Sequence, residues 1–242
     1  MAHKIKIAYW NNECQNFIVY GPTGCGKTSY TLQVLMEIYK TTKPEKLEKY
    51  FAFTPMDFIT IIKNLPSRVP TTAWDDAGVW LYYMDYNNPI IKKLAKIMQV
   101  IRTRTSSVIF TTPSPTLILG KLRNFPQTIT IKILKTKADL ENQQEMFYKI
   151  ANTPLTAEVR PFVRQTARRA QMYRSSLLPD LQKLRVYKGD YDEFNVMLPE
   201  EVYEWYIAKR EKYVELLEDD IDQDLIRQGK KLETEVSSRV IV

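Results

Sequence analysis

Residues 21–29 read GPTGCGKTS and contain three of the seven glycines in this 242-residue chain. They match the pattern G-x-x-x-x-G-K-[ST], in which glycines let the backbone curl around a phosphate while successive N–H groups point into the loop. Lys27 would then reach the β- and γ-phosphates of ATP, and Thr28 would place its hydroxyl on Mg²⁺. The expected nucleotide-binding residues are Gly21, Pro22, Thr23, Gly24, Cys25, Gly26, Lys27, Thr28 and Ser29.

The segments on either side of this stretch have the pattern that such a loop needs. Residues 16–20 form a short apolar run rich in strand-forming residues. After the loop, Leu32, Leu35, Met36 and Tyr39 recur at helical spacing. Strand, glycine loop and helix in this order place the positive end of the helix at the phosphates. The alternative is a glycine turn that merely precedes a lysine.

Two adjacent carboxylates are candidates for the metal-holding acid that a phosphate loop requires. Residues 71–74 have strand character and lead directly into Asp75 and Asp76. We expect Asp75 to hold Mg²⁺ through water, as a Walker B aspartate, together with Thr28. Asp76 would orient the attacking water at a position where many ATPases carry a glutamate. The shorter side chain of Asp76 predicts slow or partner-dependent hydrolysis, and a plain Asp-Asp turn is the alternative.

A second apolar strand is expected over 107–112, and it ends in two hydroxyls followed by a proline. Thr111 or Thr112 could sense the γ-phosphate, or the segment could be a strand followed by an ordinary proline turn. Arg102 and Arg104 close the helix before this strand. They could reach a nucleotide in a neighbouring subunit, bind DNA phosphates, or complement the negative end of the helix. The candidate catalytic residues are Lys27, Asp76, Thr112, Arg102 and Arg104.

The order of elements predicts an α/β fold with a mostly parallel sheet between helical layers. Strands are expected over 17–20, 50–54, 71–75, 107–112 and 127–135, and helices over 27–40, 56–64, 89–102 and 115–122. Residues 128–133 alternate in polarity, which favours an edge strand. Ligands of such sheets bind at the carboxyl ends of the strands, where both motifs fall. We assign residues 1–136 to this core, a three-layer sandwich of the P-loop NTPase type.

Residues 137–242 are expected to form a C-terminal extension of mixed, largely helical structure. A helix over 161–173 would carry arginines on one face, and it could bind DNA phosphates or be a solvated face. The basic residues of this segment are Arg160, Arg164, Arg168, Arg169 and Arg174. A short strand is possible over 184–187, and Pro199 opens a long helix.

Charge and cysteine content narrow the class of protein. The net charge is +7 and the isoelectric point is about 9.2, which favours anionic partners such as nucleic acid. Two cysteines and one histidine are too few for a disulfide framework or a zinc site. No apolar run has the length of a transmembrane helix or of a signal-peptide core. We therefore expect a soluble, cytoplasmic protein.

The phosphate loop, Asp75-Asp76-Ala77-Gly78 after a strand, and a strand ending in threonines resemble the ATPase core of replication initiators and helicase loaders of the AAA+ group. The layout is also similar to small P-loop ATPases of viruses and plasmids of thermoacidophilic archaea. This resemblance implies ATP hydrolysis between the subunits of an oligomer acting on DNA, in replication of a mobile element.

Two departures from that group keep other functions open. The resemblance implies an asparagine where Thr111 and Thr112 stand, and a helical lid where strand-like runs follow at 127–135 and 184–188. Extra strands are more typical of DNA-pumping and secretion motors. The alternatives are therefore a DNA-translocating or packaging motor, a nucleotide switch with little turnover, and a kinase of small substrates.

Overall fold

The computed structural model describes residues 1–82, 84, 87–125, 128–135, 167–174 and 186–239. The chain divides into two compact units, Met1–Pro199 and Glu200–Val242. The first unit contains the sheet and all the motifs considered above. The second consists of α9, a helix over Glu200–Arg239, as the Pro199-Glu200-Glu201 start predicts.

The first unit is built on one sheet with strand order β2-β3-β4-β1-β5-β6-β7. Its strands are β1 (Gln15–Tyr20), β2 (Phe51–Ala52), β3 (Thr72–Trp74), β4 (Ser107–Thr112), β5 (Thr128–Lys135), β6 (Ala167–Arg174) and β7 (Val186–Asn195). Pairings among the first five are parallel, whereas β5 pairs with β6 and β6 with β7 in the antiparallel sense. The predicted mostly parallel α/β fold is confirmed.

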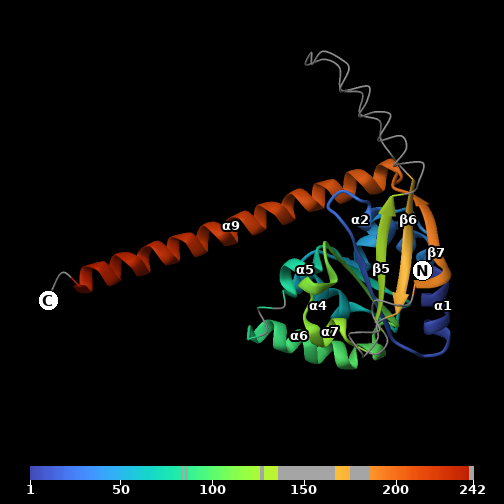
Figure 1. The fold of residues 1–242 in the computed structure, drawn as a ribbon, viewed down its shortest axis with the longest axis horizontal. Helices are drawn as coiled ribbons and strands as arrows, with labels where there is room; N and C mark the ends of the chain where they lie inside the picture. The colour runs from blue at the N-terminus through green and yellow to red at the C-terminus, as the bar shows by residue number, and fades with distance from the viewer. Residues whose placement is uncertain (83, 85–86, 126–127, 136–166, 175–185, 240–242) are drawn as a thin grey trace, which may run out of the picture. The chain divides into compact units, whose positions relative to one another are not determined.

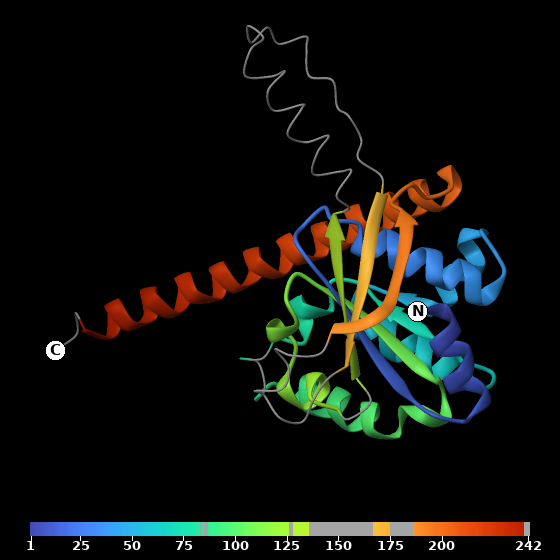
Figure 2. The ribbon, with the colours of Figure 1, turned by 45° about the vertical axis from the view of Figure 1, so that its right-hand side comes forward.

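Helices cover both faces of this sheet (Figures 1 and 2). One face carries α1 (Ala2–Trp10), α2 (Lys27–Tyr39) and the short α3 (Pro44–Leu47). The other carries α4 (Pro55–Asn64), α5 (Ala77–Trp80), α6 (Pro89–Val100) and α7 (Gly120–Arg123). The 3₁₀ turns that the described residues show in full are η1 (Glu48–Tyr50), η3 (Ile101–Thr103) and η4 (Pro115–Leu117). The result is the expected three-layer sandwich.

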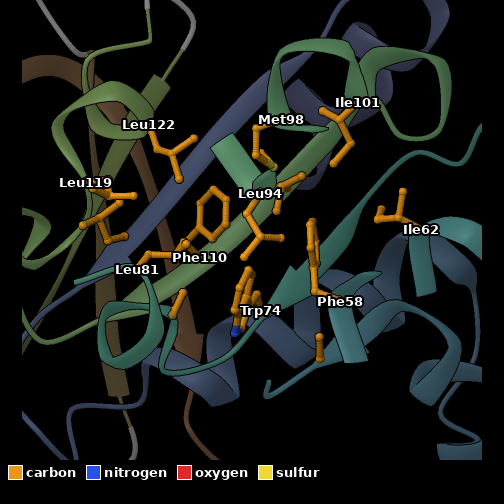
Figure 3. Packing of buried hydrophobic residues seen from close by; sticks show 14 of the residues in the cluster. Phe58, Ile62, Trp74, Leu81, Leu94, Met98, Ile101, Phe110, Leu119 and Leu122 are labelled. Atoms are coloured by element: carbon orange, nitrogen blue, oxygen red, sulfur yellow. The ribbon is translucent and has the colours of Figure 1, made fainter. Parts of the chain in front are cut away.

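A buried apolar cluster that includes stacked aromatic rings fills the layer between the sheet and α4 to α7 (Figure 3). The Trp74 ring on β3 stacks on Phe58 of α4 with centroids 5.0 Å apart, and Phe110 of β4 lies 6.4 Å from Trp74 on a tilted plane. The Trp74 indole N–H donates to the Phe53 carbonyl at 2.9 Å, so its one polar atom is paired. This packing fixes β3, and with it the position of the residue that follows Trp74.

Local sequence signals set the starts of two helices on that face. Thr54 and Asp57 form a capping box at α4, in which each side chain accepts a hydrogen bond from the other residue's backbone N–H. Asn88 caps α6 by accepting from the Ile90 N–H at 2.9 Å. A proline follows each cap at the first helical position, where it costs no hydrogen bond.

Three sequence-based predictions differ from the structure. The helix expected over 161–173 is wrong where the structure describes it, because 167–174 is β6, a strand paired along its length with β5. β5 therefore lies inside the sheet and not at its edge. The helix expected over 115–122 is replaced by η4 and α7, two short turns on either side of Ile118 and Leu119.

The C-terminal strands bear on how the chain is organised. β6 and β7 fall in the predicted extension 137–242 but continue the sheet of the predicted core 1–136. The division at residue 136 stays a prediction about domains. Within the described part of the chain, none of the helices combines the length and apolar character needed to cross a bilayer.

Candidate nucleotide-binding site

The loop over 21–26 connects β1 to α2 at the carboxyl edge of the sheet. It is closed by a hydrogen bond from the Cys25 N–H to the Pro22 carbonyl at 3.2 Å. Gly24 and Gly26 have φ angles of +76° and +96°, which side-chain-bearing residues rarely adopt. α2 begins directly after Gly26, so the loop amides and the positive end of this helix lie at one place.

Lys27 is the buried cation of this loop, with 8% of its surface exposed. Its ammonium donates to the carbonyls of Gly21 and Pro22, both at 3.0 Å, and so curls back over the loop. An ammonium has three N–H donors, and among the described residues no carboxylate pairs with this one. Because a buried charge is costly unless it is paired, the site is suited to an anion.

Thr28 and Asp75 meet across the sheet, although 47 positions separate them. The Thr28 hydroxyl lies 3.0 Å from Asp75 Oδ1 and 3.1 Å from Oδ2. Asp75 follows β3 directly and is fully buried. Hydroxyl and carboxylate oxygens are the hard ligands that Mg²⁺ prefers, so Thr28 and Asp75 would suit the ion, with Asp75 acting through water.

Thr111 joins the two aspartates. Its hydroxyl donates to Asp75 Oδ1 at 2.5 Å and accepts the Asp76 N–H at 2.8 Å. Asp76 stands at φ +48°, an uncommon left-handed conformation for a non-glycine residue, at the start of α5. The Thr111 hydroxyl thus holds the backbone turn that carries both carboxylates.

Thr112, the other candidate sensor, takes a different position. Its hydroxyl donates to the Ser114 carbonyl at 3.0 Å, away from Asp75. A Cβ on Gly78 would come within 2.3 Å of the Thr112 hydroxyl oxygen, so only a glycine lets α5 lie this close to β4. The glycine in Asp-Asp-x-Gly is explained by this approach.

Arg102 and Arg104 lie at the opposite edge of the sheet. Both precede β4, whose first residue pairs with the start of β1, whereas the phosphate loop follows the end of β1. The Arg104 guanidinium donates to the Leu65 carbonyl at 3.3 Å. The chain therefore does not bring these two arginines to its own Lys27, and any role at a nucleotide would require another subunit.

The predicted arginine stripe is not a feature of one helix. Arg168, Arg169 and Arg174 lie on the strand β6, where the four-residue spacing of a helix face does not apply. Arg160 and Arg164 lie outside the described residues.

The end of β7 contacts the phosphate loop, which sequence reasoning missed. A Cβ placed on Gly26 would lie 2.5 Å from Val196 Cγ1 and 3.6 Å from Phe194 Cε2. Tyr30 on α2 donates its hydroxyl hydrogen bond to Asp192, and Gln33 donates to the carbonyls of Asn195 and Met197. These contacts join positions more than 160 residues apart, and no local pattern in the sequence indicates them.

Comparison with known proteins finds a similar viral protein. No family model matches it. It is 29% identical over 241 residues to an uncharacterized protein, B-251, of Sulfolobus spindle-shape virus 1, a match that covers 95% of this chain and 87% of that protein.

Solved structures resemble the chain at low sequence identity. The N-terminal domain of zonular occludens toxin from Neisseria meningitidis is 14% identical, with a TM-score of 0.43, and the match covers 79% of this chain and 98% of that one. The genome packaging NTPase B204 of Sulfolobus turreted icosahedral virus 2 was solved with ATP-gammaS and with AMPPCP. These matches have TM-scores of 0.36 and 0.38 at 12% and 11% identity, and cover 75% and 78% of this chain and 97% and 100% of those chains.

The fold is that of a P-loop NTPase, because the phosphate loop follows the central strand β1 and the acidic motif follows β3, two strands away. An assignment to the AAA+ initiators is not confirmed.

Proposed function

We propose that this chain binds ATP with Mg²⁺ on residues 21–29 and hydrolyses the terminal phosphate. The observation that carries the proposal is the meeting of the Thr28 hydroxyl with the buried Asp75 carboxylate beside a buried lysine that has no carboxylate partner among the described residues. A triphosphate and its cation match both halves of this arrangement, since they supply an anion for Lys27 and a cation for Asp75.

In this proposal each residue of the site has a separate role. The loop amides and Lys27 bind the phosphate oxygens, and Thr28 with Asp75 holds the cation. Magnesium, when bound, neutralises charge that develops on the β- and γ-phosphate oxygens. Asp76 orients the attacking water, and Thr111 keeps both aspartates in place through its two hydrogen bonds. Because Asp76 is one methylene shorter than a glutamate, slow turnover is expected in the absence of a partner.

We further propose that the ATPase acts on DNA as a translocating or packaging motor in an oligomer, in preference to replication initiation. The antiparallel strands β6 and β7 extend the sheet beyond β5, an addition more typical of motors than of initiators. The basic charge of the chain and the arginines over 160–174 favour DNA as partner. A relative among viral proteins supports a role in a viral life cycle.

The test is the steady-state ATPase rate of the full chain with and without single- and double-stranded DNA, together with its mass in solution with ATP. A motor predicts Mg²⁺-dependent turnover that double-stranded DNA increases several-fold, and a mass above that of one chain. Asp76→Asn should remove most of the turnover while ATP still binds. A rate that neither DNA nor Asp76→Asn changes would contradict the motor and would favour a switch.

A further inference from the structure

We propose that the segment over 194–197, just beyond and including the end of β7, forms the wall that contacts the base of the bound nucleotide. This inference rests on the proposed function. It adds a base-binding element that lies about 170 positions after the phosphate loop and carries no recognisable motif. The residues concerned are Phe194, Val196 and Met197.

The position of Asp75 relative to β1 indicates how a bound nucleotide would be oriented. Asp75 follows β3, which lies on the β4 side of β1, so the cation and the terminal phosphate face that side. The base must then project toward the other side of β1, where β5, β6 and β7 lie side by side (Figure 1). β7 runs in the same direction as β1, because two antiparallel pairings separate it from β5, and so it ends at the carboxyl edge.

Val196 and Phe194 touch the loop at its last glycine. The Gly26 Cα lies so close to Val196 that a Cβ there would meet Cγ1 at 2.5 Å. Gly26 directly precedes Lys27, the first residue of α2. The segment therefore meets the loop next to the residues that would bind the phosphates, and a base that projects toward β7 would lie against it.

Several contacts fix the segment on α2. Tyr30 donates to Asp192 and packs its ring on Phe194 with centroids 4.9 Å apart. One turn further along α2, Gln33 donates to the Asn195 carbonyl and, at 3.2 Å, to the Met197 carbonyl. The backbone of the segment and the Phe194 ring are thus held to the same helix that begins at the phosphates, before any ligand arrives.

Apart from Asn195, whose side-chain oxygen accepts a hydrogen bond from the Met197 N–H at 3.0 Å, the side chains of this wall are apolar. Met197 has 44% of its surface exposed, and Phe194 and Val196 are each half-buried. Such side chains bind a flat base through contact area and do not read its hydrogen-bonding groups. We expect ATP and GTP to bind with similar affinity, and both to bind more tightly than inorganic tripolyphosphate, which has no base.

Calorimetric titration of Met197→Ser with three probes tests this assignment: Mg–ATP, Mg–GTP and magnesium tripolyphosphate. The variant should raise the Kd of both nucleotides about tenfold and leave that of tripolyphosphate within about twofold. The control is Met56→Ser, an exposed methionine at the start of α4, on the face of the sheet opposite α2, which should change none of the three. Met197 is exposed, so its replacement is not expected to impair folding.

The outcomes separate the two proposals. If wild-type protein binds both nucleotides and Met197→Ser weakens them no more than it weakens tripolyphosphate, the base-wall assignment is wrong and the nucleotide site stands. If the folded wild-type protein binds none of the three probes, the proposed function fails and this inference fails with it.

Discussion

The hydroxyl of Thr28 lies 3.0 and 3.1 Å from the two carboxylate oxygens of Asp75, although the two residues belong to different strand–loop units of the sheet. Parallel strands bring them together, since the loops after β1 and β3 both open at the carboxyl edge. The buried aromatic packing of Trp74 fixes the strand end from which Asp75 projects. The site is therefore a direct product of the fold.

Thr111 should matter more to turnover than to nucleotide affinity. Thr111→Val removes the hydroxyl that holds Asp75 and the Asp76 N–H, so we expect kcat to fall ten- to a hundredfold while the KM for ATP stays within about threefold. Steady-state kinetics measures both. Thr128→Val is a matched control, because that buried hydroxyl donates to the Leu122 carbonyl away from the aspartates. If kcat falls further in Thr112→Val than in Thr111→Val, the role belongs to Thr112 and the assignment to Thr111 is wrong.

Gly26→Ala should destabilise the protein more than Gly24→Ala. Both glycines have positive φ, but only the new Cβ at Gly26 meets another side chain, Val196 Cγ1 at 2.5 Å. We expect a loss of about 3 kcal/mol in the free energy of unfolding for Gly26→Ala and about 1 kcal/mol for Gly24→Ala. Urea denaturation measures this difference.

The double variant Gly26→Ala/Val196→Ala supplies the control for that prediction. Removing the Val196 methyl groups should recover about 1–2 kcal/mol of the loss, because only the overlap is relieved and the backbone strain remains. Equal stability of the two single glycine variants would show that Val196 does not press on the loop.

Tyr39 makes stability fall at alkaline pH. Burial, the largest influence, raises the pKa of Tyr39 well above its ordinary value, and its hydroxyl donates to the Thr71 carbonyl while its ring stacks on Tyr50 at 3.8 Å. Above about pH 10 the unfolded chain releases this proton and the folded chain keeps it, so the free energy of unfolding falls by up to about 1.4 kcal/mol per pH unit.

Tyr39→Phe checks that assignment. At pH 7, where the hydrogen bond is intact, the free energy of unfolding of the variant should be about 1 kcal/mol lower than that of the wild type. Above about pH 10 it should fall less steeply with pH, by the slope that corresponds to about one proton. Denaturation curves from pH 7 to pH 11 give both numbers. An unchanged alkaline slope would exclude Tyr39 as its source.

Arg68 joins three segments at the amino edge of the sheet. Its guanidinium donates to the carbonyls of Arg102 at 2.9 Å, Tyr9 at 2.9 Å and Glu13 at 2.6 Å, and it lies over the Tyr9 ring. Since a lysine cannot reproduce this planar fork, Arg68→Lys should cost about 2 kcal/mol of stability, close to the cost of Arg68→Met. Thermal or urea unfolding of both variants measures these costs. A lysine variant as stable as the wild type would show that the positive charge alone, without the planar guanidinium, holds the three segments.

Short-range patterns in the sequence predicted the parallel part of the fold well. The glycine loop and Asp75-Asp76 each occupy consecutive positions, so their placement at strand ends could be inferred without knowing the rest of the chain. α1 was not anticipated, because its nine residues show little separation of apolar and polar faces.

Pairing between distant segments could not be inferred in the same way. The arginines of 160–174 suit a helix by spacing, yet β6 forms because β5 on one side and β7 on the other supply its hydrogen bonds. The contact between Val196 and Gly26 likewise depends on where β7 ends. Thr111 and Thr112 point to opposite faces of β4, and the sequence alone did not show which of the two faces Asp75.

The most direct test of the nucleotide site is calorimetric titration of Mg–ATP into the wild-type chain and into Lys27→Ala, with circular dichroism to show that both are folded. The account predicts one ATP per chain for the wild type, binding that weakens when EDTA removes the magnesium, and at least a hundredfold loss of affinity in Lys27→Ala. Heat of binding that is absent from folded wild-type protein, or is the same in Lys27→Ala, would contradict it.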